Sequence, residues 1–281
     1  MKRIFTLCIA ICTLMTGFAQ TDTTGQKTDT IKVGGMIIIR KPGTNDAESK
    51  KDKHIIISNN SNRRYKPSNI STNWIIFDLG FANYNDNTNY ASLGAQQFAP
   101  GGTKDKFSLQ TGKSVDVNIW FFMQRLNLIQ HVVNLKYGLG LELNNYRYDN
   151  RDIRFHKNPT YIDVNDPDLA NVYVKKNKLA ADYITIPLML NFNFTPGHGR
   201  GFGLSAGISA GYLYSARQKT KIDGHVNKIH GDFDLERWKL SYIAELNLGP
   251  VRLYGSYAFK SMWSKGLDQR PYNFGLRFSN W

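Results

Sequence analysis

Two overlapping stretches of the sequence match the spacing of a serine nucleophile. They are "GLSAG" at residues 203–207 and "GISAG" at residues 207–211, and both follow the pattern G-x-S-x-G. In enzymes this pattern exposes the serine hydroxyl on a sharp turn between a strand and a helix. Here small and apolar residues keep alternating through both stretches, which is typical of one uninterrupted strand. We therefore predict that Ser205 and Ser209 are small inward-facing residues and not nucleophiles.

Two polar stretches carry oxygen and imidazole groups that could bind a metal ion. "DVNDPD" at residues 163–168 is rich in carboxylates but lacks the glycine of a calcium-binding EF-hand loop. "GHVNKIHGDFD" at residues 224–234 contains His225, His230, Asp232 and Asp234. Polar stretches of this composition are usually solvated loops, so we predict neither a metal site nor a cofactor.

Charged residues at alternate positions form the largest candidate set. In "NLKYGLGLELNNYRYDN" (134–150), Lys136 and Glu142 share one parity with two glycines, while leucines and a tyrosine take the other. This period of two predicts a strand with one apolar and one polar face. It recurs around residues 73–84, 114–124, 183–194, 202–214, 238–248, 251–260 and 272–279. The polar parity of these strands carries Asp78, Asp116, Lys136, Glu142, Lys239, Glu245, Arg252, Lys260 and Arg277, which we call the lumen charge network.

The connections between the strands alternate in length. Short turns lie near residues 127–130, 195–200 and 249–250, and long polar loops span roughly 85–112, 149–178, 218–235 and 262–271. Short turns on one side, long loops on the other and aromatic residues at the strand ends are typical of a transmembrane β-barrel. We therefore predict an all-β fold, an eight-stranded antiparallel transmembrane β-barrel over residues 73–281.

A soluble β-sandwich or lipocalin-like barrel would show the same alternation and would place the charges in water. The membrane barrel is favoured by the even strand number, the alternating loop lengths and the N-terminal signal described next. Eight strands leave room only for side chains in the lumen. Buried charges must then pair, because an unpaired buried charge is costly.

The N-terminus predicts export. Lys2 and Arg3 precede an apolar run and the small residues of "GFA", which indicates a secretory signal peptide over residues 1–19. Both cysteines lie inside it, so we expect no disulfide in the mature chain. Residues 20–72 carry ten Lys or Arg against five Asp or Glu, and include the apolar runs "MIIIR" and "HIIIS". We interpret them as a basic, mostly flexible periplasmic segment with room for one β-hairpin.

These features predict a place in the outer membrane of a Gram-negative cell envelope, with outer-membrane lipid as a partner. The formal net charge is +14. Strongly basic proteins often bind nucleic acid or anionic surfaces. Because the predicted compartment is the periplasm and the outer membrane, we do not expect nucleic acid as a partner.

The strand set at residues 73–281 resembles the PorT-like outer-membrane β-barrel family of Bacteroidota. "NLKYGLGLELNNYRYDN", "ADYITIPLMLNF" and "GFGLSAGISAGYLY" look like that family's third, fourth and fifth strands. Ile186–Pro187–Leu188 is the most distinctive step, and a β-bulge is expected there because proline cannot donate to the ladder. The resemblance implies the barrel and links a founding relative to protein secretion, a role that does not follow from a shared fold.

Three functions are compatible with the sequence. The first is a non-enzymatic outer-membrane barrel, structural or interaction-mediating through its long outer loops. The second is an accessory component of protein secretion, in which residues 20–72 dock periplasmic or secretion-machinery proteins. The third is a lipid-modifying barrel enzyme with His156, His225 and His230 as candidates, although no partner residue stands at a recognisable spacing.

Overall fold

The computed structural model describes residues 29–33, 36–40, 68–196 and 201–279, and the chain divides into two units, residues 1–65 and 66–281. In the first unit, β1 (Asp29–Val33) and β2 (Met36–Arg40) form an antiparallel hairpin. The run "MIIIR" therefore pairs with the preceding "DTIKV". The run "HIIIS" and the predicted signal peptide, residues 1–19, lie outside the described residues.

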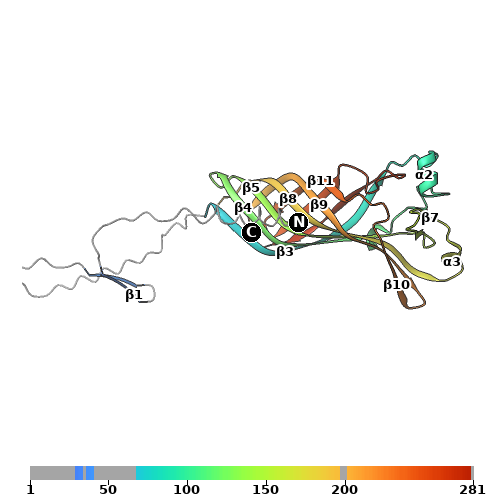
Figure 1. The fold of residues 1–281 in the computed structure, drawn as a ribbon. Helices are drawn as coiled ribbons and strands as arrows, with labels where there is room; N and C mark the ends of the chain where they lie inside the picture. Colours follow the sequence, from blue (N-terminus) through green and yellow to red (C-terminus); the bar gives the residue numbers. More distant parts are fainter. Residues whose placement is uncertain (1–28, 34–35, 41–67, 197–200, 280–281) are drawn as a thin grey trace, which may run out of the picture. The chain divides into compact units, whose positions relative to one another are not determined.

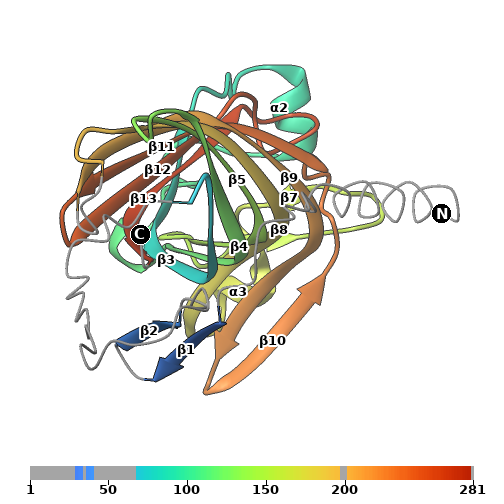
Figure 2. The same cartoon turned by 90° about the vertical axis from the view of Figure 1, so that its left-hand side faces the viewer.

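In the second unit, eight antiparallel strands close into a ring (Figures 1 and 2). The order around the ring follows the chain, and the last strand pairs with the first. This confirms the predicted eight-stranded antiparallel barrel. Its strands are β3 (Ile70–Asp86), β4 (Val115–Ile129), β5 (Val133–Arg147), β8 (Val174–Asn193), β9 (Phe202–Ile222), β11 (Trp238–Leu248), β12 (Val251–Ala258) and β13 (Gln269–Phe278).

The two faces of the ring differ as the alternation predicts. Apolar side chains such as Leu79, Leu188 and Leu276 point outward and are about half exposed. The residues between them face the lumen and are buried. A continuous exposed apolar belt of this size marks a surface that water does not cover. Among the described residues, no helix is long and apolar enough to cross a membrane.

Bulges reverse the parity of β3, β4 and β9. In β9 the pairing with β8 skips Tyr214, because Leu213 is opposite Tyr183 and Ser215 is opposite Asp182. Ile75 adopts a left-handed conformation (φ 55°), so Trp74 and Ile75 are both exposed and Ile76 is buried. In β4, the pairing with β5 shifts between Trp120 and Phe122. Met123, which the alternation places on the outward face, is consequently buried in the lumen. A bulge re-aims the side chains that follow it, and the period of two alone does not reveal it.

The bulge expected at Pro187 is absent. The β5–β8 register is the same before and after this residue, with Tyr137 opposite Leu188 and Gly140 opposite Thr185. Between these two pairs, Ile186 and Pro187 have no ladder partner in β5. On the other side of β8, Pro187 remains paired with Ser209 of β9. The missing N–H thus removes ladder bonds on one side without shifting the strands.

The long connections are more structured than solvated loops. Strands β8 and β9 extend to 20 and 21 residues, so residues 174–178 and 218–222 are strand and not loop. Figure 1 shows α2, β7, α3 and β10 gathered at one end of the barrel. The elements of the long connections are α2 (Leu93–Phe98), η1 (Thr111–Lys113), β6 (Arg154–Phe155), β7 (Ile162–Asp163), α3 (Pro167–Ala170) and β10 (His225–His230).

Candidate functional site

The barrel lumen holds eight of the nine residues of the lumen charge network. Lys260 differs, because β12 ends at Ala258 and the chain has already turned into an exposed loop at this position. Without Lys260 the set contains as many acids as bases. The eight buried residues are Asp78, Asp116, Lys136, Glu142, Lys239, Glu245, Arg252 and Arg277.

Arg277 of β13 is the centre of the larger group. Its Nε and Nη2 donate to the two carboxylate oxygens of Asp78 at 2.7 and 2.6 Å, and Nη1 donates to Glu245. Lys136 donates to the other oxygen of Glu245, and Trp120 Nε1 donates to Asp78 at 2.7 Å. The group joins β3, β4, β5, β11 and β13. Charged side chains of four strands and the indole of a fifth are therefore tied together across the lumen. The Arg277–Asp78 contact has the bidentate geometry that suits guanidinium and carboxylate.

Glu142 of β5 is the centre of a second group. Lys239 of β11 donates to its Oε1, as does Asn273 Nδ2 of β13 at 3.0 Å. Thr185 Oγ1 of β8 donates to its Oε2 at 3.3 Å. Asp116 lies nearby and accepts from the Tyr254 hydroxyl of β12. Most of these buried charges thus have partners of opposite sign or several hydrogen-bond donors, as a dry interior requires.

The glycine beside these charges has a steric role. Gly140 lies opposite Trp120 in the β4–β5 ladder, and a Cβ at residue 140 would stand 2.6 Å from the indole Cε3. The absence of a side chain therefore makes room for Trp120, whose ring also lies under the Arg277 guanidinium at 5.4 Å. The alternation of glycine and charge in the third strand reflects this packing of large side chains inside a narrow ring.

The space among the charged groups in the middle of the lumen is small, and a larger cavity of about 160 Å³ lies beside Lys239 and Tyr183. A cavity of about 30 Å³ lies among Trp120, Met189, Glu245 and other side chains. One water needs roughly 10–15 Å³ by this measure, so about two waters fit. Ser205 and Ser209 lie in the middle of β9 and are buried, and Asn191 Nδ2 donates to Ser205 Oγ at 3.0 Å. Both serines are inward-facing strand residues as predicted, and neither has the turn that a nucleophile needs.

The loop end of the lumen is closed by an aromatic core that the sequence analysis missed. All four long connections contribute to it, and Phe155 and Trp263 stack with ring centroids 6.0 Å apart. Trp263 also packs against Phe98 at 5.6 Å, and Phe155 against Phe233 at 5.4 Å. We call this core the loop cap; its aromatic members are Phe98, Phe107, Tyr148, Phe155, Phe233 and Trp263.

The loop cap is continuous with the lumen. Tyr84, Tyr146 and Tyr183 of the barrel strands belong to the same buried cluster. The Tyr84 hydroxyl donates to the carbonyl oxygen of Phe107. Burial raises the pKa of Tyr148 far above the ordinary tyrosine value, so this residue is neutral at physiological pH. The one to three aromatic residues in each predicted loop were the available signal, since aromatic side chains are more often buried than polar loop residues.

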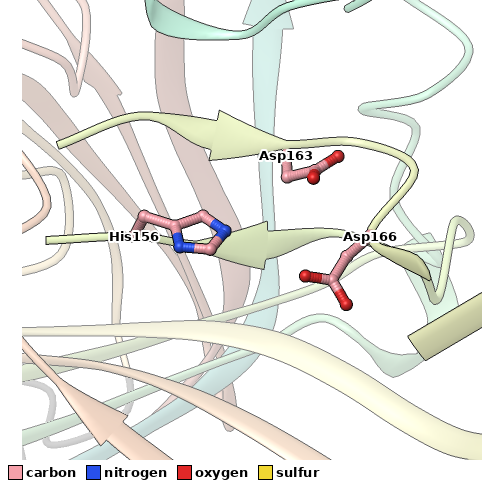
Figure 3. A group of neighbouring side chains, drawn as sticks. All are labelled: His156, Asp163 and Asp166. Atoms are coloured by element: carbon pink, nitrogen blue, oxygen red, sulfur yellow. The ribbon is translucent and has the colours of Figure 1, made fainter. Parts of the chain in front are cut away.

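Among the described residues, one group has the spacing of metal ligands. The ligand atoms of His156, Asp163 and Asp166 all lie within 4.8 Å of one another (Figure 3). Both oxygens of Asp166 are engaged, because Oδ1 accepts from the amides that begin α3 and Oδ2 pairs with Arg154 at 2.9 Å. A cation would have to displace Arg154. The arrangement therefore acts first as a structural clamp on the β6–β7 connection.

The other histidine and aspartate candidates are not brought together. His225 and His230 lie at the two ends of β10 and are exposed. Asp234 pairs with Lys265 at 2.7 Å. His156 instead stacks on Tyr161 with ring centroids 4.2 Å apart. The stretch 224–234 thus forms a hairpin strand and part of the loop cap and not a ligand set.

Comparisons with known proteins agree with this architecture. The family described as "Outer membrane protein beta-barrel domain" matches residues 73–262. Two crystal structures of Ail, the attachment invasion locus protein of Yersinia pestis, are similar at 11% identity, over 74% of this chain and 98% of Ail. Their TM-scores are 0.31 and, for the complex with the heparin analogue sucrose octasulfate, 0.30, and such values carry no argument about function. No curated protein matches the chain. The chain belongs to the family of outer membrane protein β-barrel domains, and its barrel spans the outer membrane.

Proposed function

We propose that this protein is a non-enzymatic outer-membrane barrel that binds partners at the cell surface through its loop cap. The observation that carries the proposal is the shared aromatic core of the four long connections. Flexible loops lose conformational entropy when they bind, whereas a surface that is already ordered loses little. A cap held by Phe155 and Trp263 therefore suits recognition better than four independent loops would.

The filled lumen supports the same proposal. The Arg277 and Glu142 groups cross the ring. The cavity among their side chains has about 30 Å³, and a separate cavity of about 160 Å³ is lined by Lys239 and Tyr183. A general diffusion pore needs a continuous water-filled path, which larger barrels provide. Transport through the barrel is accordingly not part of the proposed function.

A lipid-modifying activity receives less support. Such chemistry needs a general base with an orienting partner next to a place for the substrate. His225 and His230 are exposed, and His156 lies against Tyr161.

The relation to PorT-like proteins of Bacteroidota is part of the proposal and rests on the strand sequences at residues 134–150, 181–192 and 201–214. The alternative function is a role in protein secretion, with residues 20–72 as a docking arm. The experiment below must distinguish it from binding at the cell surface.

The test combines three measurements on the full chain. In planar lipid bilayers, the purified protein should give no stepwise conductance. A deletion strain should secrete the same proteins as its parent. On arrays of surface proteins and glycans, protein in nanodiscs should bind at least one class of partner, and the Phe155→Ala/Trp263→Ala variant should lose this binding. Leu93→Ala/Tyr173→Ala, which changes exposed loop residues outside the cap, is the matched control.

Each of the three measurements can contradict one part of the proposal. Loss of many secreted proteins from the deletion strain would replace the proposal with the secretion hypothesis, and deletion of residues 21–72 would then locate the arm. Stepwise conductance would overturn the closed barrel. Equal binding by wild type and the cap variant would show that recognition does not depend on the cap.

A further inference from the structure

Basic side chains stand in register across four neighbouring strands at the loop end of the barrel. Arg147 of β5 is opposite Lys178 of β8, which is opposite Lys219 of β9, which is opposite Lys228 of β10. A second row joins Lys176 of β8 to Lys221 of β9. We call these six residues the cation array: Arg147, Lys176, Lys178, Lys219, Lys221 and Lys228.

The array lies on the outer face of the sheet. Along β9, Gln218 and Thr220 are buried toward the loop cap, while Lys219 and Lys221 have the opposite parity and are partly exposed. Residues opposite each other in an antiparallel ladder point to the same face, with Cβ atoms about 4.5–5.5 Å apart. The side chains of each row are therefore neighbours on one surface.

Like charges directly opposite each other destabilise a sheet, so their repetition calls for a compensating partner. Within the described part of the chain, the array residues form no ion pair with a carboxylate. Asp182, the acid nearest in the ladder, is paired with Arg217. Lys178 donates to Asn145 at 2.5 Å, and Arg147 Nη2 donates to a main-chain carbonyl at 3.1 Å, while Arg147 Nε is buried without a hydrogen-bond partner. The array thus holds uncompensated positive charge.

The position of the array relative to the lipid belt points to its partner. Tyr212 and Tyr214 are the last outward-facing aromatic residues of β9 before the array begins. Aromatic side chains of barrels sit at the boundary between hydrocarbon and head groups. With a rise of about 3.3 Å per residue and a tilt of about 40°, Lys219 stands roughly 12 Å above Tyr214. Its long flexible side chain can bend back toward the membrane.

We propose that the cation array binds the phosphate groups of anionic lipid head groups in the outer leaflet of the outer membrane. The array is spread over a flat sheet face, so one free phosphate would meet few donors at a time. A layer of phosphate-bearing head groups meets several at once. Lysines and an arginine are suited to this, because ammonium and guanidinium groups form charge-assisted hydrogen bonds with phosphate oxygens. The site also accounts for part of the excess positive charge of the chain, separately from residues 20–72.

The experiment measures lipid binding to the full-length protein in neutral detergent by native mass spectrometry. The probes are bis-phosphorylated lipid A, the same lipid without its phosphates, and inorganic phosphate alone. The test variant is Lys178→Gln/Lys219→Gln/Lys228→Gln. The matched control is Lys104→Gln/Lys113→Gln/Lys157→Gln, which removes the same charge from exposed loop lysines outside the array. The heat-dependent gel shift of folded barrels verifies that each variant is folded.

Each lysine near a lipid surface contributes about a fivefold change in binding, so the test variant should bind bis-phosphorylated lipid A about 100-fold more weakly. The control variant should bind within twofold of wild type. If both variants bound the lipid equally weakly, the loss would follow from the lower net charge alone, and the proposal of a specific site would be refuted. Binding that survives removal of the lipid phosphates would also overturn it. Inorganic phosphate that binds as tightly as the lipid, through the same lysines, would make this a free-anion site instead.

The repulsion within the array gives a second readout that does not depend on lipid. In neutral detergent, the test variant should have a higher thermal unfolding midpoint than wild type, because it removes three like charges from one row. A midpoint lowered by this variant would mean that the lysines support the sheet by contacts of their own, and the array would then be structural.

Discussion

The ion pair between Asp78 and Arg277 should be the most sensitive point of the barrel. Both side chains are almost fully buried, at 0% and 4% exposure, and they share two hydrogen bonds of 2.7 and 2.6 Å. With Glu245 and Lys136 they form a group of two acids and two bases. Asp78→Asn would leave this group with one excess positive charge inside the lumen. Removing one partner of a buried pair costs about 3–5 kcal/mol.

The double variant Asp78→Asn/Arg277→Met should recover most of this loss. It restores a neutral group, because Glu245 keeps Lys136. Replacing both members of a buried pair is often neutral or stabilising by about 1–4 kcal/mol. The two single variants should therefore be much more destabilised than the double variant, with a coupling energy of about 3 kcal/mol.

Reversible urea unfolding of the barrel in lipid vesicles, followed by tryptophan fluorescence, measures these free energies. The linear dependence on urea gives the free energy of unfolding for each variant. If either single variant lost less than about 1 kcal/mol, the pair would behave like a solvated surface ion pair. If the double variant lost the sum of the two single losses, the two residues would act independently. Either result would refute the description of the lumen as a dry, paired interior.

Three further predictions concern the other parts of the molecule. Trp263→Ala removes the ring that packs against Phe98 and Phe155, so it should destabilise the loop cap by about 3–5 kcal/mol and expose the loops of intact cells to added protease, whereas unchanged protection would disprove a shared core. Asp166→Ala removes the α3 cap and the Arg154 pair, so it should cost about 1–2 kcal/mol, with faster hydrogen exchange confined to residues 162–170; an effect that also requires zinc would instead make the group a metal site. Burial raises the pKa of Tyr148 and Tyr90 in the folded protein, while unfolded tyrosine ionises near pH ~10, so the stability of the cap should be complete below about pH 10 and fall as the pH rises above it. Absorbance at 295 nm during an alkaline unfolding titration measures this, and Tyr148→Phe should reduce the loss.

The barrel itself could be predicted because its signal is local. Each strand reports its own two faces through the alternation of residues such as Leu135, Lys136 and Tyr137. The predicted faces hold along each strand until a bulge interrupts it, as at Ile75 and Phe121, after which Met123 faces the lumen. The position of a bulge depends on how one strand pairs with its neighbours around a closed ring. The alternation within a single strand therefore does not predict it.

The loop cap could not be predicted for a different reason. Phe98, Phe155, Phe233 and Trp263 stand in four connections far apart in the sequence. Each connection alone has the composition of a polar, solvated loop, because its one to three aromatic residues cannot form a core by themselves. Ring closure brings the four connections to the same end of the barrel, and only there do their aromatic side chains bury one another.

The sequence by itself determined the fold class, the eight strands, the lumen-facing parity and the near balance of the charges that must pair. It did so because a strand crossing a membrane must alternate residue by residue. The tertiary structure decided which charges meet, that Lys260 lies outside the lumen, and that Arg147, Lys178, Lys219 and Lys228 form one row. These outcomes depend on the register between strands and on closure of the ring, which join residues that the chain itself keeps far apart.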